Sequence, residues 1–199
     1  MAQARVLTDK ELKRVLNYTA TQPHSHRNRC LILCTHLGGM RVGEVAALKI
    51  SDVLGADGQI KEEIGLTAQQ TKGSSSRTVV VPQKLRTELA SYLQQRFGLK
   101  DLLAVTKTDT ERTLFPTQKN PKRGFTANTL CQLFHSIYSA SALTGATSHS
   151  GRRGFITKLA DKGVSVRVLM ALAGHKSIAT TQRYIELNPS LLRASAELI

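Results

Sequence analysis

The residues between His149 and Tyr184 combine one phenol with several basic groups. They read HSGRRGF, LAGHKS and TTQRYI, and they supply His149, Arg152, His175 and Tyr184. A phenol has a pKa near 10, so it becomes a useful nucleophile only if a nearby base or cation helps it to lose its proton. The same cations can stabilise charge that builds on a phosphoryl group in a transition state. The pattern points to attack of a tyrosine on a phosphodiester, against the simpler interpretation that Tyr184 packs on a helix surface.

Two arginines are candidates for binding the phosphate. The guanidinium group binds two phosphate oxygens at once and stays charged at any working pH. Arg41 follows Gly38-Gly39-Met40 at the expected start of a helix, where free backbone N–H groups also favour an anion. Arg41 could instead form an i,i+3 ion pair with Glu44. Arg152 could be ordinary helix charge, and its neighbour Arg153 is a rival for the role.

Three further residues could move protons or donate hydrogen bonds. His149 lies three positions before Arg152 on one helix face and could take up the phenol proton, or it could simply cap the helix. His175, in a Gly-His turn, could donate to a nonbridging oxygen. Lys72, in QQTKGSSSR, is expected at a hairpin tip. It could protonate a departing 5′-hydroxyl or make a nonspecific phosphate contact.

The charge balance indicates a polyanionic partner. The 199 residues include 28 Lys and Arg against 14 Asp and Glu, a net charge of +14. Such an excess is costly in self-repulsion unless a polyanion neutralises it, and its dispersal through the chain favours a basic surface on nucleic acid. A basic membrane-surface protein is the alternative. The candidate DNA contacts are Lys72, Arg77, Lys119, Lys122, Arg123 and Arg153.

Several other kinds of site are missing from the sequence. It has no GxxxxGK[ST] loop, no HExxH, no paired CxxC and no acidic cluster suited to two metal ions. We therefore expect a reaction without a metal, ATP or other cofactor. Cys30, Cys34 and Cys131 are expected to be buried, reduced thiols. No apolar run is long enough to span a bilayer and no signal region opens the chain, so a cytoplasmic, nucleoid-associated location is expected, with no membrane partner.

The elements that must position these residues are mostly helical. Apolar spacing and capping signals predict helices over 8–21, 25–37, from about 41, 82–96, 126–142, 148–161, 165–172 and 178–187, with one more short helix at the C-terminus. Residues 60–81 read as a β-hairpin around KGSSS, and 100–125 as looser chain with a basic loop, TQKNPKRG. The predicted fold is mainly α with a small antiparallel β-sheet (α+β), in a single domain over 1–199.

Taken together, the segments resemble the catalytic domain of the tyrosine recombinase (phage integrase) family. The matching pieces are GGMRVGEVAALKISDV, QTKGSSSRTVVVP, SHSGRRGF and LAGHKSIATTQRYI, in the family's order and at its approximate separations. They contain Arg41, Lys72, His149, Arg152, His175 and Tyr184. The resemblance implies a site-specific recombinase of prokaryotic or phage type that acts on double-stranded DNA.

The resemblance also implies a role for each residue. Tyr184 would attack the scissile phosphate, form a 3′-phosphotyrosyl link and release a 5′-hydroxyl, which a partner strand would later replace through a Holliday junction. His149 would assist proton transfer at Tyr184, and Lys72 would protonate the leaving oxygen. Glu44 would support the site. The residues that would stabilise the phosphorane are Arg41, Arg152 and His175.

Two departures from the family pattern matter. Gly151 stands where members commonly have a hydrophobic residue, often Leu, so a packing side chain is missing there. Arg41 comes too early in the chain to leave room for the N-terminal core-binding domain that most members carry. The chain is then either a catalytic fragment or a natural minimal recombinase resembling fimbrial-switch invertases and small integrases, and its capped first helix favours the second.

The resemblance extends to partners and to competing functions. Residues 188–199 are expected to pack on a neighbouring protomer in a homo-tetramer on DNA, and an accessory DNA-bending or directionality factor could take part. A type IB topoisomerase-like nicking and closing enzyme uses a similar set of residues. A noncatalytic DNA-binding regulator on the same scaffold is the third hypothesis, and the intact set of six argues against it.

Overall fold

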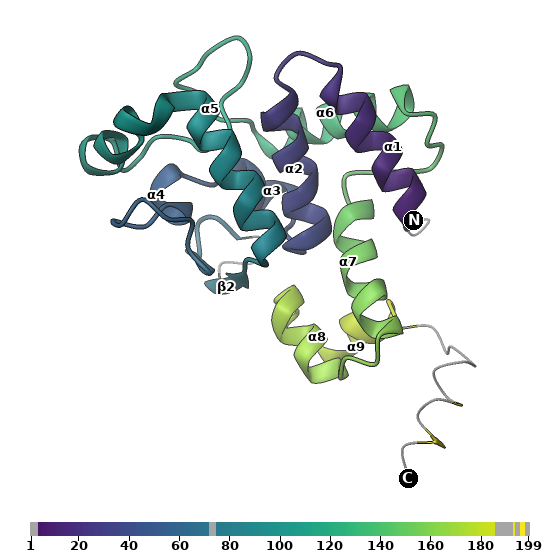
Figure 1. The fold of residues 1–199 in the computed structure, drawn as a ribbon. Helices are drawn as coiled ribbons and strands as arrows, with labels where there is room; N and C mark the ends of the chain where they lie inside the picture. The colour runs from purple at the N-terminus through teal and green to yellow at the C-terminus, as the bar shows by residue number, and fades with distance from the viewer. Residues whose placement is uncertain (1–3, 72–74, 186–192, 194–195, 198–199) are drawn as a thin grey trace.

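Helices make up most of the structure, with one small antiparallel sheet (Figure 1). The computed structural model describes residues 4–71, 75–185, 193 and 196–197. In that part of the chain the sheet has two strands, and the sheet shares one apolar core with the helices that precede residue 141. The predicted α+β class, mainly helical with a small antiparallel sheet, is confirmed.

The centre of the core is α2 (Ser25–Leu37), which packs against α1 (Asp9–Ala20), α5 (Gln83–Thr108) and α7 (Ser150–Asp161). Its residues 30–36 are all buried, which places every side of this part of the helix in the protein interior. The predicted capping signal before α1 is present, because the Thr8 hydroxyl and the Glu11 carboxylate each accept a hydrogen bond from the other residue's backbone N–H.

The hairpin joins β1 (Glu63–Leu66) to β2 (Arg77–Val80), with Leu66 paired to Arg77. Ile64, Leu66 and Val79 are buried beneath it. Two short helices precede the hairpin, α3 (Val42–Ala46) at the predicted place and α4 (Ile50–Val53), which the sequence pattern did not predict. The predicted hairpin is confirmed, but its tip at 72–74 lies outside the described residues.

The prediction that residues 100–125 are loose was wrong for their first part. Helical chain resumes after Gly98, whose φ of +70° interrupts α5, and continues to Thr108. Leu102 and Val105 are buried three positions apart on this second half, a helical spacing that the sequence analysis overlooked. The basic loop is real, and a bridge between Pro116 and Gly124 closes it.

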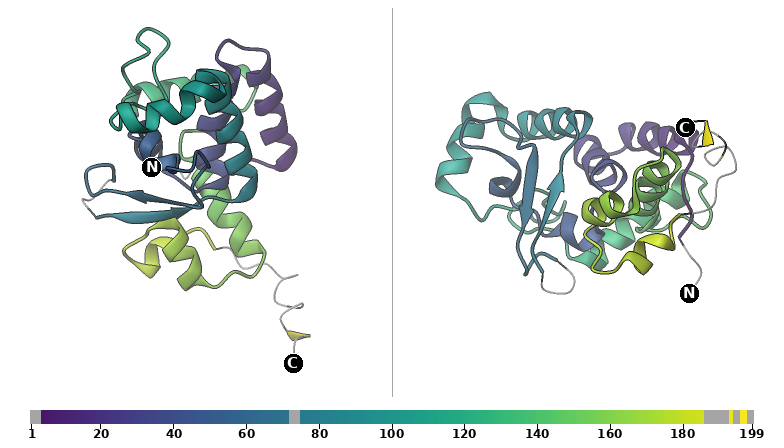
Figure 2. Two further views of the ribbon diagram at one scale, coloured as in Figure 1. Left: turned by 60° about the vertical axis from the view of Figure 1, so that its left-hand side comes forward. Right: turned by 90° about the horizontal axis from the view of Figure 1, so that it is seen from below.

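The C-terminal half contains α6 (Ala127–Ala140), α7, α8 (Val166–Ala173) and α9 (Ile178–Gln182). The hairpin lies beside α8, and α8 and α9 lie together at the end of α7 (Figure 2). Gly174 ends α8 in the left-handed conformation, so the predicted Gly-His turn is present. The prediction that the helix from residue 178 extends to 187 was wrong, because α9 ends at Gln182 and Tyr184 lies in the turn that follows.

Two of the three cysteines are buried in this fold. Cys30 and Cys34 are buried free cysteines, as predicted, whereas Cys131 is only partly buried. Burial raises the pKa of Cys34 to about 12, which leaves it an unreactive core thiol. Within the described chain, every helix is too short or too polar to span a bilayer.

Candidate active site

Glu44 is the buried acceptor around which the cationic residues assemble. Its side chain is 1% exposed, and its two oxygens accept bonds from the Arg41 backbone N–H, the Arg41 guanidinium and both Nε and Nη2 of Arg77. Burial opposes ionisation, but the hydrogen bonds and charges of Arg77 and Arg41 outweigh it and lower the pKa of Glu44. Glu44 therefore stays ionised and holds two arginines in fixed positions, the supporting place in which the sequence put it.

Part of the Arg41 guanidinium is not engaged in hydrogen bonds within the described chain. The i,i+3 pair with Glu44 forms at 2.9 Å, but it is no surface pair, because Glu44 is buried. The Arg41 side chain is 26% exposed, and within the described chain its Nε and Nη2 make no hydrogen bond. Its backbone N–H, which we expected to favour an anion, is donated to Glu44 instead. The free side of the guanidinium can still bind an anion.

Arg152 is a buried cation that joins two separate segments. Its Nη1 donates to the Gly39 carbonyl at 2.6 Å, and its Nη2 donates to the Ala173 carbonyl at the end of α8. Burial, together with the charges of Arg41 and Arg77, lowers the pKa of Arg152 to about 9. In the described structure no carboxylate bonds to this guanidinium directly. A phosphate would therefore bring the negative charge that this 5% exposed side chain lacks.

His175 lies in the same cationic cluster and is uncharged at neutral pH. Burial and the positive charges of Arg152, Arg41 and Arg77 lower its pKa to about 4. The ring is 9% exposed, and its Nδ1 lies 2.9 Å from the Thr181 hydroxyl. A neutral imidazole keeps one N–H, so His175 can donate one hydrogen bond without adding a charge to the site.

Tyr184 stacks on His175, with ring centroids 5.7 Å apart and an interplanar angle of 22°. The Arg153 guanidinium carbon lies 5.9 Å from the centroid of the same phenol ring. The Tyr184 backbone N–H donates to the Thr181 carbonyl at 3.0 Å, and its carbonyl accepts from the Thr157 hydroxyl of α7 at 3.4 Å. The fold thus brings the predicted nucleophile next to the predicted histidine, with the arginines in the same cluster.

The described structure leaves one predicted catalytic residue, His149, outside this cluster. His149 is exposed at the N-cap of α7, and in the described chain its imidazole makes no hydrogen bond. His149 and Arg152 therefore differ in exposure, although they lie three positions apart. Lys72 lies outside the described residues, so its position relative to Tyr184 is not defined.

Arg77 occupies a different place from the surface contact that we expected. Its side chain is 9% exposed and donates to both oxygens of Glu44 and to the Leu172 carbonyl of α8. A β-carbon on Gly174 would lie 2.4 Å from its Cδ. Sequence reasoning missed this positioning contact, and also Thr181. The sequence signal for Arg77 was its place as a basic residue at the start of a strand. The signal for Thr181 was its place three positions before the tyrosine, in a pair of threonines.

Three of the predicted DNA contacts lie in one exposed loop, whereas Arg153 lies on α7 beside Tyr184. Lys119, Lys122 and Arg123 all project from the turn between Pro116 and Gly124. Backbone hydrogen bonds between residues 117 and 123 and a bond from the Lys122 N–H to the Asn120 side chain hold its shape. The loop presents three cations to the solvent, as a phosphate-binding segment requires.

The unusual glycine before Arg152 marks a close contact between helices. A β-carbon on Gly151 would lie 2.1 Å from the Thr35 hydroxyl oxygen and 2.8 Å from Cδ2 of His36. Both residues are buried on α2. Gly151 therefore does not leave a gap where a packing side chain is missing. It lets α7 approach α2 closely enough for Arg152 to reach Gly39.

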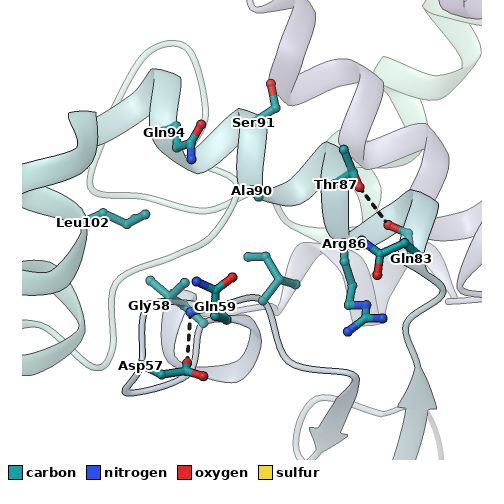
Figure 3. A pocket seen from close by; sticks show the side chains of 12 residues that line it. Asp57, Gly58, Gln59, Gln83, Arg86, Thr87, Ala90, Ser91, Gln94 and Leu102 are labelled. Atoms are coloured by element: carbon teal, nitrogen blue, oxygen red, sulfur yellow. Dashed lines mark hydrogen bonds between the residues drawn. The ribbon is translucent and has the colours of Figure 1, made fainter.

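A cavity of about 740 Å³ lies away from this cluster, between α5 and the chain around residues 54–60 (Figure 3). Its walls include Asp57, Gln59, Arg86 and Gln94, and hydrogen bonds within each wall join Thr87 to Gln83 and Gln59 to Asp57. None of the predicted catalytic residues in the described chain lines it. The chemistry is therefore assigned to the arginine cluster, whose residues were brought together from four parts of the chain.

Comparison with known proteins agrees with this geometry. The model of the phage integrase family matches residues 5–190, nearly the whole chain. The chain belongs to the phage integrase family.

Individual relatives and solved structures that resemble this chain include Xer recombinases. Tyrosine recombinase XerA of Pyrococcus furiosus is 29% identical over 192 residues, which cover 96% of this chain and 60% of the relative. The crystal structure of a XerA recombinase superposes with a TM-score of 0.74 at 26% identity, covering 100% of this chain and 66% of that one. A XerH site-specific recombinase bound to difH substrate has the same fold, with a TM-score of 0.69 at 23% identity, over 96% and 53% of the two chains.

The chain covers only part of the length of the relatives it matches. It spans 60–62% of the length of XerA recombinases from four archaeal strains. What those whole proteins do is therefore carried to this chain only as a proposal.

Proposed function

We propose that this chain is a site-specific DNA recombinase that cuts and rejoins strands through a covalent 3′-phosphotyrosyl intermediate. The observation that carries the proposal is the cluster in which Tyr184 stacks on neutral His175 beside the buried cation Arg152 and the partly free Arg41. Kinship with tyrosine recombinases supports it.

In the proposed cleavage, the Tyr184 phenolic oxygen attacks the phosphorus atom of the scissile phosphodiester. A bond forms between the phenolic oxygen and phosphorus, and the bond from phosphorus to the 5′ oxygen breaks. Negative charge gathers on the nonbridging oxygens, where Arg41 and Arg152 supply positive charge and His175 donates a hydrogen bond. Each such preorganised donor is worth roughly 3–4 kcal/mol in related transition states.

Two protons must move in this step. We assign the proton lost by the phenol to His149, whose imidazole is exposed at the start of α7 and makes no hydrogen bond in the described chain. We assign the proton gained by the departing 5′ oxygen to Lys72 on the hairpin.

The second half of the reaction reverses the first. A 5′-hydroxyl from a partner strand attacks the phosphotyrosyl phosphorus and releases the Tyr184 phenol. The number of phosphoester bonds is unchanged, so the energy of the first bond is kept in the intermediate. We therefore propose that the reaction needs no ATP, metal or other cofactor.

The proposed substrate is double-stranded DNA that carries a specific recombination site. The net charge of +14 and the exposed loop with Lys119, Lys122 and Arg123 suit a phosphate backbone. Each neutralised phosphate releases counterions, so binding should weaken steeply with salt. We place the reaction on nucleoid DNA in the cytoplasm, where free thiols such as Cys30 and Cys34 remain reduced.

We further propose that the chain works as a homo-tetramer on DNA. Exchange between two duplexes requires one tyrosine for each of the strands that are cut. The 188–199 segment, most of which lies outside the described residues, is proposed to pack on a neighbouring protomer. A chain ending at Leu187 should still bind one site but lose synaptic complexes in gel-shift assays, and wild-type synapsis by that chain would contradict the idea. Recombination of a supercoiled plasmid by the purified protein alone would remove the need for an accessory DNA-bending or directionality factor.

The decisive experiment uses a nicked suicide substrate containing the cognate site, found by mapping the genomic DNA that the protein binds. The expected product is a covalent protein–DNA adduct that is lost in Tyr184→Phe. Tyr18→Phe, which changes a half-buried tyrosine on α1, is the matched control and should keep it. Absence of an adduct with the wild-type protein would refute the enzymatic proposal. Relaxation of plasmids that lack the site, at equal efficiency, would instead indicate a topoisomerase.

Lys72 has its own test. Lys72→Ala should slow cleavage strongly on ordinary DNA and much less when sulfur replaces the 5′ leaving oxygen, because a thiolate leaves without protonation. An equal defect on both substrates would remove Lys72 from the acid role.

A further inference from the structure

Thr181 is a fully buried residue that contacts both His175 and the backbone of Tyr184. Its side chain is 0% exposed, and its hydroxyl oxygen lies 2.9 Å from Nδ1 of His175. Its carbonyl accepts the backbone N–H of Tyr184 at 3.0 Å. Neither the family resemblance nor the mechanism proposed above assigns this residue a role.

The burial of the hydroxyl determines which atom donates in this hydrogen bond. Among the described residues, the Thr181 hydroxyl has no partner other than His175. If Nδ1–H donated to it, the hydroxyl hydrogen would be buried without an acceptor, which is an unfavourable arrangement. If the hydroxyl donates to Nδ1, its hydrogen is satisfied and no buried donor is left unpaired. The second arrangement is favoured.

The direction of that bond fixes the tautomer of the imidazole. Because Nδ1 accepts, it carries no hydrogen, and the single proton of the neutral ring must lie on Nε2 across the ring. The neighbouring cations Arg152, Arg41 and Arg77 disfavour a second proton on the ring. The opposite tautomer would leave Nε2 as an acceptor, and it could then repel a phosphate oxygen but not donate to it.

We propose that Thr181 is a positioning residue that holds His175 as the Nε2–H tautomer and so makes it a hydrogen-bond donor to a nonbridging phosphate oxygen. The inference rests on the proposed phosphoryl-transfer function. The same residue sets the nucleophile, since its carbonyl anchors the turn that carries Tyr184. One threonine thereby links the orientation of the donor to the position of the phenol stacked on it.

The kinetic test compares three single substitutions on the nicked suicide substrate. Thr181→Val keeps the shape but removes the hydroxyl, and Thr181→Ser keeps the hydroxyl. Thr180→Val makes the same change at the exposed neighbouring residue and is the matched control. Thr181→Val should lower the single-turnover rate of adduct formation about 10- to 100-fold, the usual effect of losing a partner that orients a functional histidine. Its Kd for the site in gel shifts should stay within about twofold of wild type, because the phosphate-binding arginines are retained. Thr181→Ser and Thr180→Val should cleave at near wild-type rates.

A spectroscopic test needs no DNA and no activity. Long-range ¹H–¹⁵N spectra at pH 7.5, with the His175 signals identified by their loss in His175→Gln, report which ring nitrogen carries the proton. The wild-type protein should show Nε2–H with Nδ1 accepting a hydrogen bond. Thr181→Val should lose the hydrogen-bond signature at Nδ1, and Thr181→Ser should keep it.

The two tests separate this inference from the proposed function. An Nδ1–H tautomer in the wild-type protein, or undiminished cleavage by Thr181→Val, would overturn the role of Thr181. If the wild-type protein formed no adduct at all, the recombinase proposal would fail, and the spectra would still decide whether Thr181 sets the tautomer.

Discussion

Replacing Gly151 by alanine should destabilise the protein, although alanine is normally the better helix former. The added β-carbon would lie 2.1 Å from the Thr35 hydroxyl oxygen and 2.8 Å from Cδ2 of His36, far inside the ~3.5–4 Å of ordinary contact. Thr35 cannot easily turn away, because it is branched at Cβ, 0% exposed and bonded through its hydroxyl to the Ile32 carbonyl. The helices α2 and α7 must therefore move apart.

The expected magnitude follows from two opposing effects. Overpacking a core costs roughly 1–3 kcal/mol, and so close an approach belongs at the upper end of that range. Replacing glycine by alanine within a helix returns about 1 kcal/mol. The free energy of unfolding of Gly151→Ala should thus fall by about 2 kcal/mol, and Tm by about 4–8 °C for a chain of this size. Because Arg152 is the next residue, the same shift would pull its guanidinium from the Gly39 carbonyl and slow adduct formation.

The matched control is Gly154→Ala, one turn later on the same helix. A β-carbon there would meet only Cγ1 of Val6 within 4 Å, at an ordinary 3.7 Å. This variant should therefore keep the wild-type stability or gain up to about 1 kcal/mol. Urea unfolding followed by far-UV circular dichroism measures both variants. The reasoning is refuted if Gly151→Ala proves as stable as Gly154→Ala.

Three further predictions concern the buried residues Glu44 and His36 and the positive-φ glycine Gly174. Glu44→Gln should lower the free energy of unfolding by about 3–5 kcal/mol in urea titrations, because it leaves the buried Arg77 guanidinium without a counter-charge. Glu62→Gln, at a pair whose carboxylate is 78% exposed, should cost less than about 1 kcal/mol. Equal losses would contradict the account. Burial, with the charge of Lys158, lowers the pKa of His36 to about 4. Between pH ~6.5 and 4 the unfolded chain therefore binds a proton that the folded chain does not. The free energy of unfolding should fall as the pH falls through this window, by up to about 3 kcal/mol from His36. A urea midpoint that is unchanged, or that rises, from pH 7 to pH 5 would argue against this. Gly174→Ala should lower the free energy of unfolding by about 1–3 kcal/mol, because the position has a φ of +62° and its β-carbon would meet the buried Arg77 side chain. An unchanged Tm in thermal unfolding would contradict this prediction.

Local signals in the sequence were enough to predict the helices and the hairpin. The Thr8–Glu11 capping pair, the glycines after α2 and the Gly174 turn each act through neighbouring residues, so their effects can be read without the fold. The second half of α5 was missed because Gly98 interrupts the pattern that Leu102 and Val105 continue. The end of α9 was misplaced because helix propensity alone does not stop at Gln182.

The arrangement of the site could be predicted only in part. Residue types and order predicted that Arg41, Arg152, His175 and Tyr184 form one site, and the structure places these four residues in one cluster. The role of Arg77 could not be predicted, since its partner Glu44 is 33 residues away and meets it only when the hairpin folds over α3. A basic residue at the start of a strand is equally consistent with a surface contact, and only burial distinguishes the two.

The same contacts that give the site its charge also hold Tyr184, the proposed nucleophile, in place. The apolar residues of α8, Leu169 and Ala173, are buried but are not part of the main apolar core. Arg152 and Arg77 donate to the two carbonyls at the end of this helix, where the helix dipole favours positive charge. The turn after α8 then carries His175, and α9 leads on to Tyr184. The position of the phenol therefore depends on the arginines that would stabilise its transition state, and a variant that removes one of them should lose alignment together with charge.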